Sequence, residues 1–172
     1  MKKIFDWHST LFPDVIEIKV GEYRTNESPI QVVSGAMGKQ SVHFEAPPSH
    51  QAPREMKTFI EWFNYSRVPG AMGIKLAPIR AAIAHLYFES IHPFEDGNAR
   101  IGRAIAEMAL SQGLNRPVLM SLSDAIQSRK KAYYTQLERV QRTTEITDWI
   151  TWFVYLVLEG QQRAESQIDF NL

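Results

Sequence analysis

Cysteine is absent from the 172 residues of this chain. Neither a disulfide nor a zinc site built on thiolates can therefore stabilise the fold. A chain of this length does not need such staples, because it can bury roughly 70% of its unfolded surface in one domain. We therefore expect a single domain over residues 1–172, and the absence of cysteine fits a cytoplasmic protein.

Long apolar runs and an excess of one charge are absent as well. The longest apolar run, residues 149–158, is far shorter than the ~20 residues of a membrane helix. The chain start, MKKIFDWHST, reaches Asp6 and His8 before any apolar run, unlike a secretory signal. Lysine plus arginine and aspartate plus glutamate both number 19, which gives no basic excess for nucleic acid. We expect neither a membrane nor a nucleic acid as partner.

The most informative stretch is residues 91–103, IHPFEDGNARIGR. Residues 78–91 before it place apolar side chains at the spacing of one helix face. Residues 103–110 after it predict a second helix, which ends near Gly113 with Pro117 just beyond. Two apolar helices are thus joined by a polar turn, and the polar residues need a chemical explanation.

The turn contains residue types that suit the binding of phosphate. Gly97 can adopt a positive φ, so that successive backbone N–H groups face one point. Asn98 can cap the second helix, whose first N–H groups attract anions. Arg100 and Arg103 are three positions apart on that helix, so they share a side and can clamp phosphate oxygens.

Two further residues of the turn suit catalysis. Asp96 is a hard oxygen ligand, suited to a Mg²⁺ ion that keeps waters and bridges phosphates. His92 is an imidazole, whose ordinary pKa near neutrality suits a general base. His85, two helical turns earlier, lacks the spacing of a metal pair with His92 and is interpreted as a core or interface residue. The sequence thus predicts a nucleotide-phosphate site with a base that activates an acceptor.

The run HPFEDGNARIGR resembles the signature loop of the Fic family, H-P-F-x-D/E-G-N-G-R-x-x-R. Every defining position matches but one, since Ala99 replaces the second loop glycine. The resemblance implies an all-α, multihelical Fic fold of about seven helices with one small β-hairpin flap, and it covers roughly residues 20–160. It also implies a protein adenylyltransferase, which transfers AMP from ATP to a Ser, Thr or Tyr hydroxyl of a target protein.

The resemblance gives each residue of the loop a role in this AMPylation reaction. His92 would deprotonate the target hydroxyl, and Asp96 would hold Mg²⁺ against the α- and β-phosphates of ATP. Gly97, Asn98 and the backbone amide of Ala99 would bind phosphates.

The arginines would neutralise the departing pyrophosphate. Arg100 and Arg103 are both present, and because Gly97 is kept too, AMP transfer is favoured over the phosphoryl transfer of Doc-type relatives. Ala99 is nearly harmless if it lies in helical φ/ψ, whereas a positive φ there would cost about 1 kcal/mol or more.

Residues 21–44 resemble the region that precedes the Fic loop. Gly21 to Arg24 match its G-x-Y-R run, and the β-prone runs 31–33 and 42–44 predict a hairpin. In the family this flap lies over the nucleotide and aligns the target by strand addition. The corresponding candidates here are Val32, Val33, Ser34 and Gly35, although a surface hairpin without this role would have the same pattern.

A helix predicted from Ser123, its N-cap, to about Arg142 carries a tyrosine pair. In the family such a pair, here Tyr133 and Tyr134, flanks the nucleotide base. A polar residue seven places later, here Gln141, also contacts the base. Aromatic filling of the core explains the pair equally well.

The sequence lacks the inhibitory motif S/T-x-x-x-E-G/N of many Fic enzymes. Its one Glu-Gly pair, Glu159-Gly160, has Tyr155 four places earlier and is interpreted as the end of a helix that begins at Thr147. The chain is therefore uninhibited, silenced by a separate antitoxin-like protein, or a segment without an upstream regulatory region. A homodimer is left open.

Two other functions stay open. The same loop could transfer a phosphoryl or another diphosphate-linked group. Alternatively, the chain could be a catalytically decayed binding module of a toxin–antitoxin pair, with Ala99 as a mark of decay.

Overall fold

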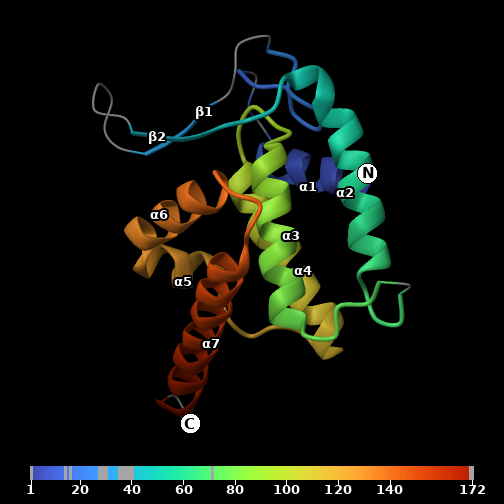
Figure 1. Cartoon of the computed structure of the whole chain (residues 1–172). Helices are drawn as coiled ribbons and strands as arrows, with labels where there is room; N and C mark the ends of the chain where they lie inside the picture. The colour runs from blue at the N-terminus through green and yellow to red at the C-terminus, as the bar shows by residue number, and fades with distance from the viewer. Residues whose placement is uncertain are drawn as a thin grey trace.

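The computed structural model describes residues 2–13, 15, 17–26, 31–34, 41–70 and 72–170, without the side chains of 31–34, 41–44 and 168–170. The described residues form seven α-helices, two short strands and one 3-10 turn (Figure 1). In chain order these are α1 (Lys2–Leu11), β1 (Gln31–Ser34), β2 (Ser41–Glu45), η1 (Ser49–Gln51), α2 (Ala52–Tyr65), α3 (Ala77–Ile91), α4 (Asn98–Leu114), α5 (Leu122–Ser128), α6 (Lys130–Val140) and α7 (Thr147–Phe170). The predicted all-α, multihelical fold is confirmed. None of these helices is long and apolar enough to cross a membrane.

The centre of the molecule is the helix pair α3 and α4, which are joined by the short polar turn (Figure 1). A proline in the first turn of α3 suits a helix start, because its missing N–H has no partner there in any case. The helix ends at Ile91, because the C-cap His92 precedes Pro93 and a residue before proline is disfavoured in the right-handed helical region. His92 adopts left-handed φ/ψ of 49° and 60° instead.

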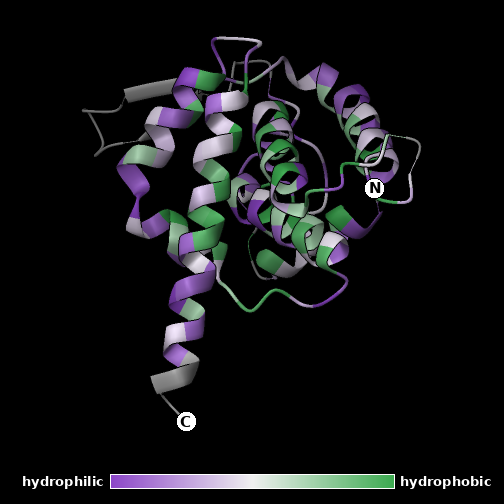
Figure 2. Ribbon diagram, turned by 60° about the horizontal axis from the view of Figure 1, so that its bottom comes forward, coloured by the Kyte–Doolittle hydropathy of each residue, from purple (hydrophilic) through white to green (hydrophobic). Residues whose placement is uncertain are grey.

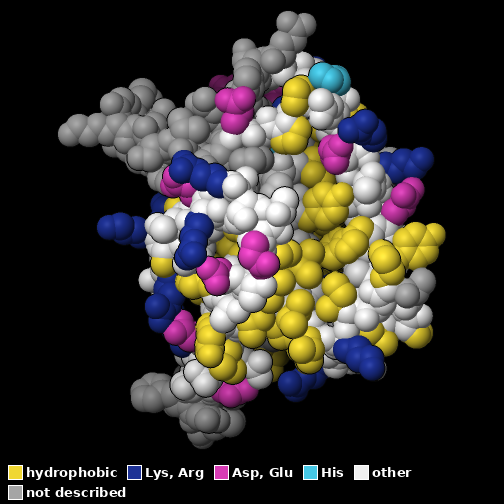
Figure 3. All heavy atoms as spheres, viewed as in Figure 1, with side chains coloured by type: hydrophobic (Ala, Val, Ile, Leu, Met, Phe, Trp, Pro, Cys, Tyr) yellow, Lys and Arg dark blue, Asp and Glu magenta, His cyan; other side chains and the backbone are white. Residues whose placement is uncertain are grey.

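α3 has no polar side, because α2, α4 and α7 all pack against it. Its half-buried residues Ile79, Ile83 and Tyr87 follow one another at intervals of four along the remaining side. Figure 3 shows apolar side chains gathered in the middle of one face of the molecule. The described chain therefore leaves one apolar side of its central helix partly exposed.

The core lies where the helices meet, and the hydropathy of the ribbons turns apolar toward this centre (Figure 2). Full burial of an aliphatic or aromatic side chain stabilises the fold by about 1.5–3 kcal/mol. Many of the large apolar side chains that are less than 2% exposed come from α2, α3, α4 and α7, and they include Phe59, Phe88, Ile101, Leu110, Trp149 and Phe153. The indole N–H of Trp149 is not left unpaired, since it donates to the Ala82 carbonyl at 2.9 Å.

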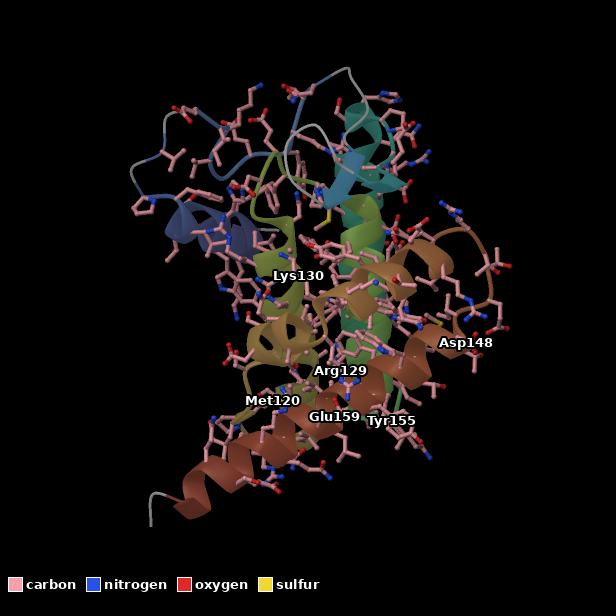
Figure 4. All side chains as sticks on the ribbon, turned by 90° about the vertical axis from the view of Figure 1, so that its left-hand side faces the viewer. Met120, Arg129, Lys130, Asp148, Tyr155 and Glu159 are labelled. Carbon is pink, nitrogen blue, oxygen red and sulfur yellow. The ribbon has the colours of Figure 1, made fainter. Side chains whose placement is uncertain are left out.

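The predicted helix from Ser123 to Arg142 is wrong in two respects. Its N-cap is Ser121, whose Oγ accepts a hydrogen bond from the Asp124 N–H at 3.2 Å. The helix is also divided at Arg129, where φ is −127°. The Arg129 guanidinium binds both carboxylate oxygens of Glu159 on α7, at 2.7 and 2.5 Å, and so ties the junction between α5 and α6 to α7 (Figure 4).

The interpretation of Glu159-Gly160 as a helix end is also wrong, because α7 continues to Phe170. Gly160 packs closely on Met120, since a Cβ there would lie 2.6 Å from Cε of Met120 and that side chain would have to move. Figure 4 shows Met120 close to this part of α7. Glu159 pairs with Arg129, which agrees with the prediction that it is not an inhibitory glutamate.

The predicted strands are present as β1 and β2, which pair antiparallel with Val32 opposite Phe44 and Ser34 opposite Ser41. The register shifts between Val32 and Val33. Gly35 and the rest of the connection to residue 40 lie outside the described residues.

Arg80 joins three helices at the end of α3 that is remote from the polar turn. Its side chain is 2% exposed and donates to the Phe63 carbonyl at 2.6 Å, to Ser66 Oγ at 3.0 Å and to Gln112 Oε1 at 3.0 Å. Its acceptors lie near the C-termini of α2 and α4, where carbonyl groups lack helical partners and attract a cation. No carboxylate of the described residues forms an ion pair with Arg80.

We predict that Arg80→Met lowers the free energy of unfolding by about 3 kcal/mol or more, because buried acceptors lose their donor. Arg54→Met is the matched control, since the Arg54 side chain is 77% exposed and pairs only with neighbouring Glu55. It should change the unfolding free energy by less than about 1 kcal/mol. Urea denaturation measures both, and equal losses in the two variants would contradict the structural role of Arg80.

Candidate functional site

Two left-handed residues shape the turn between α3 and α4. His92 is the first, and Gly97 is the second, with a φ of 79°. A Cβ at Gly97 would lie 2.8 Å from Cε2 of Phe12, so glycine is required for space as well as for conformation. The predicted positive φ at Gly97 is confirmed.

Asn98 holds the turn closed and does not cap α4. Its Oδ1 accepts the Phe94 N–H at 2.9 Å, and its Nδ2 donates to the Phe94 carbonyl at 2.8 Å. Asn98 is 2% exposed and Phe94 is fully buried. The prediction that Asn98 caps the helix is therefore wrong, because the N-cap is Gly97 and the amide turns back into the loop.

His8 of α1 packs against the turn and forms a hydrogen bond with it, a role that the sequence did not indicate. Its Nδ1 accepts the Gly21 N–H at 2.9 Å, so the proton is on Nε2, which donates to the Asp96 carbonyl at 3.1 Å. The imidazole is fully buried and stacks on Phe94 with ring centroids 4.2 Å apart. Burial lowers the pKa of His8, which favours this neutral form.

Arg24, from the G-x-Y-R run, closes the C-terminus of α3. Its side chain is 1% exposed, and its Nε donates to the His92 carbonyl at 2.7 Å. A second contact runs from Nη2 to the Pro47 carbonyl at 2.5 Å. The backbone N–H of Arg24 donates to the Pro93 carbonyl at 2.9 Å. The bond to His92 satisfies a carbonyl group that the end of α3 leaves without a partner, and the other two tie the helix end to residues 47 and 93.

His92 is half-buried, and its Nδ1 is buried with no hydrogen-bond partner. The other ring nitrogen, Nε2, is not among the buried atoms of the described residues that lack a partner. Burial, and to a lesser extent the charge of Arg24, lowers the pKa of His92 to about 4. The imidazole is therefore neutral at pH 7 and able to accept a proton.

A pocket of about 260 Å³ opens over the turn. It is lined by residues of α3, the turn, the start of α4, and α6, namely Glu89, His92, Glu95, Asp96, Gly97, Asn98, Ala99, Tyr133, Tyr134 and Leu137. The structure thus brings together seven of the ten residues predicted for catalysis, metal and nucleotide binding, and it leaves Arg100, Arg103 and Gln141 out of the lining. A larger hollow of about 570 Å³ lies between α6 and α7, but its charged side chains form ion pairs with one another, including Arg139 with Asp148 at 2.8 Å.

The two arginines of the loop are not brought together. Arg100 lies over the ring of Phe12, 4.4 Å from its centroid, and its Nη2 is 3.4 Å from Oδ2 of Asp96. Arg103 donates from Nε to Ser123 Oγ on α5 at 2.8 Å. Neither arginine lines the pocket, so the expectation of one shared clamp is not met. Each guanidinium instead lies against an aromatic face or a polar acceptor nearby.

The two tyrosines differ in position: one fills the core, and the other lies at the pocket wall where a nucleotide base could contact it. Tyr133 is 4% exposed, and its hydroxyl lies 3.0 Å from Nε2 of His85, so it fills the core beneath the pocket. Tyr134 is half-buried at the pocket wall. Gln141 is not part of the pocket lining, and its Nε2 lies 3.5 Å from Ser90 Oγ. The predicted contact of Gln141 with a base therefore has no support from this geometry.

Glu89 is a site residue that the sequence reading missed. It lies three residues before His92, is 3% exposed and lines the pocket. Burial raises its pKa to about 7, and the positive charge of Arg103 opposes this effect. A lone glutamate within the apolar run of residues 79–91 was the signal that could have identified it.

Ala99 and Asp96 fit the predicted chemistry. Ala99 lies in the first turn of α4 and is not among the described residues with a positive φ, so the strain considered for it does not arise. The Asp96 side chain is 63% exposed at the pocket. No group of three or more described acidic or histidine side chains could hold a metal alone. A single carboxylate suits Mg²⁺ that takes its other ligands from phosphate and water.

The first 110 residues of the chain match the family model described as Fic/DOC family. A probable protein adenylyltransferase of Aquifex aeolicus (strain VF5) is 31% identical over 67 residues, which are 39% of this chain and 19% of that protein. The protein adenylyltransferase Fic of Drosophila erecta is 30% identical over 135 residues, which are 78% of this chain and 23% of that protein. The chain thus spans about a quarter or less of these curated relatives.

Solved structures show the same fold. A Fic family protein from Desulfovibrio desulfuricans G20 aligns with a TM-score of 0.77 at 24% identity, over 96% of this chain and 47% of that one. A Fic domain containing signaling protein from Bacteroides thetaiotaomicron VPI-5482 aligns with a TM-score of 0.72 at 23% identity, over 95% of this chain and 59% of that one. Because the family model covers more than half of the sequence, and the fold agrees, this chain belongs to the Fic/DOC family.

Proposed function

We propose that this chain is the catalytic domain of a protein adenylyltransferase, which transfers AMP from ATP to a Ser, Thr or Tyr hydroxyl of a target protein. The observation that carries the proposal is the pocket in which neutral His92 lies beside Asp96 and the backbone of residues 97–99. The names of the curated relatives, protein adenylyltransferase, support the same reaction. We place the reaction in the cytoplasm, where ATP and target proteins are available.

His92 is the proposed base, although its lowered pKa makes it a weaker proton acceptor than an imidazole with a pKa near neutrality. The incoming hydroxyl oxygen would attack the α-phosphorus of ATP while its proton passes to Nε2 of His92. The bond from the α-phosphorus to the oxygen shared with the β-phosphate then breaks, and pyrophosphate leaves. Because the pKa of His92 is lowered to about 4, the ring does not need to lose a proton first at pH 7.

The start of α4 offers donors for the phosphates. Its first helical bond to the turn runs from the Ile101 N–H to the Gly97 carbonyl at 3.1 Å. The N–H groups of Asn98, Ala99 and Arg100 precede this bond, so the helix does not use them. Unused N–H groups at a helix start bind anions, and the helix dipole adds to the attraction.

Asp96, Arg100 and Arg103 complete the proposed site. Asp96 would hold Mg²⁺, which supplies charge neutralisation at the phosphates when bound. Arg100 would exchange its present partner for phosphate oxygens, and Arg103 would direct the N–H groups that Ser123 does not accept toward them. The exchange costs little, because exposed pairs such as Arg100 with Asp96 are worth about 0–1 kcal/mol.

The hairpin is proposed to dock the target segment. In a two-stranded sheet each strand leaves one edge unpaired, and an extended peptide can add to such an edge. Val32, Val33 and Ser34 of β1, with Gly35 after them, are the proposed docking residues. An antitoxin-like protein or an upstream region is the proposed source of inhibition, since Glu159 pairs with Arg129.

Labelled ATP tests the reaction. With Mg²⁺ present, we predict that label from the α-phosphate, and not from the γ-phosphate, becomes bound to protein hydroxyls. His92→Ala should reduce the rate by about 10²–10⁴, the usual contribution of a general base, and keep the helical circular dichroism. His50→Ala, at an exposed histidine of η1, is the control and should keep full activity. Transfer of the γ-label would show a phosphoryl transferase, and absence of ATP binding would show a decayed module.

The charge state of His92 is a second prediction. Its folded pKa lies below the ordinary value of 6.5, so the folded protein resists the proton that the unfolded chain accepts. The stability contribution of His92 is therefore complete above about pH 6.5 and is lost as the pH falls toward 4. The ring resonances, assigned by comparison with His92→Gln, should not titrate between about pH 5.5 and 8 in the NMR spectrum. A midpoint near 6.5 would contradict the burial argument.

Arg103→Ala should raise KM for ATP by about tenfold to a hundredfold, because a charge-assisted contact to phosphate is lost. The matched control is Arg139→Ala, whose side chain is 67% exposed and pairs with Asp148 away from the turn. Steady-state kinetics with varied ATP measure both variants. An unchanged KM in Arg103→Ala would remove Arg103 from the site.

A further inference from the structure

Three polar side chains lie buried beneath the pocket. They are His85 and Glu89 of α3 and Tyr133 of α6, with exposed fractions of 0%, 3% and 4%. His85 Nε2 and the Tyr133 hydroxyl are 3.0 Å apart. By contrast, Oε1 of Glu89 and Nδ1 of His85 have no hydrogen-bond partner within the described structure. A buried carboxylate oxygen without a partner is costly and needs an explanation.

The two unpartnered atoms lie against Gly102 of α4. A Cβ at Gly102 would be 2.4 Å from Oε1 of Glu89 and 3.3 Å from Nδ1 of His85. The glycine therefore leaves room for the carboxyl group directly beside the helix backbone. The residue that follows in this helix is Arg103.

Arg103 is the cation whose charge reaches this buried cluster. Burial raises the pKa of Glu89, and the positive charge of Arg103 opposes this shift. Burial lowers the pKa of His85, and the same charge lowers it further. The same charge also acts on Tyr133. All three buried groups therefore lie within electrostatic reach of one guanidinium. No ion pair joins Arg103 to Glu89 in the described structure, where Nε of Arg103 is bound to Ser123.

We propose that Glu89 is a positioning residue for Arg103: its carboxylate accepts an N–H of the guanidinium and turns the remaining donors toward the phosphates of a bound nucleotide. A guanidinium has five N–H donors in a fixed plane, so Ser123 and Glu89 can each accept one and leave others for the ligand. The identity of that ligand as ATP rests on the proposed function.

A double-mutant cycle on nucleotide binding tests the proposal. Calorimetric titration with Mg²⁺ and a non-hydrolysable ATP analogue gives Kd for the full chain, Glu89→Gln, Arg103→Ala and the double variant. Glu89→Gln should raise Kd by about tenfold in the full chain, and by less than about twofold in the Arg103→Ala background. The same tenfold loss in both backgrounds, or no loss in either, would overturn the positioning role.

A pH series separates positioning from a merely structural effect. The ratio of Kd in Glu89→Gln to Kd in the unchanged chain cancels the titration of the nucleotide itself. This ratio should be about ten near pH 8.5 and fall toward one near pH 5.5, because a protonated Glu89 resembles glutamine. His85, with a pKa lowered to about 4, and Tyr133, with a pKa well above its ordinary value, do not titrate in this range. A ratio that does not change with pH would contradict the proposal.

Two further variants complete the design. Gly102→Ala displaces the Glu89 carboxyl without changing any charge, so it should also raise Kd and confirm the result if Glu89→Gln folds poorly. Glu165→Gln, at an exposed glutamate of α7, is the matched control and should leave Kd unchanged. If the unchanged chain binds the analogue and transfers AMP while the cycle is additive, the positioning role alone fails. If the unchanged chain does not bind the analogue, the proposed function fails with it.

Discussion

The pair of hydrogen bonds between the Asn98 amide and the backbone of Phe94 is the constraint on which the site depends. It closes the turn on itself, and buried Phe94 then anchors the closed turn between α3 and the stacked ring of His8. With the turn fixed, the backbone of residues 97–99 and the imidazole of His92 face one pocket. Because the Asn98 side chain is used in this way, the donors left for an anion are backbone N–H groups.

Burial decides which groups of the site carry charge. Removal from water disfavours the charged form, so the pKa values of His92 and Glu89 move in opposite directions, one toward 4 and the other toward 7. Arg24 and Arg80 keep their charges in the interior because backbone carbonyls and polar side chains surround them. The imidazole of His92 at the pocket wall is therefore neutral at pH 7, whereas the charge of the buried cluster of His85, Glu89 and Tyr133 depends on the carboxyl group of Glu89.

The sequence predicted the elements that depend on local chemistry and missed those that depend on tertiary contacts. Apolar periodicity predicted α3 and α4, and glycine in the loop predicted the left-handed turn. The break at Arg129 was missed because no proline or glycine is near it, and its ion pair comes from a distant helix. The role of Asn98 was predicted wrongly, because an asparagine that caps a helix and one that bonds back to the backbone of its own loop occur in the same local sequence pattern. The contribution of His8 could not be predicted, since it lies outside the motif and only the fold brings it there, whereas Glu89 was missed although a lone glutamate in an apolar run was a usable signal.

The central claim is that the turn between α3 and α4 binds a nucleotide triphosphate through the first N–H groups of α4. Backbone amide shifts in the NMR spectrum, recorded during titration with Mg²⁺ and an ATP analogue, test this claim most directly. The largest shift changes should occur at the amides of Asn98 and Ala99, which begin α4 and line the pocket. Saturable changes confined to another part of the molecule, such as the hollow between α6 and α7, would contradict it.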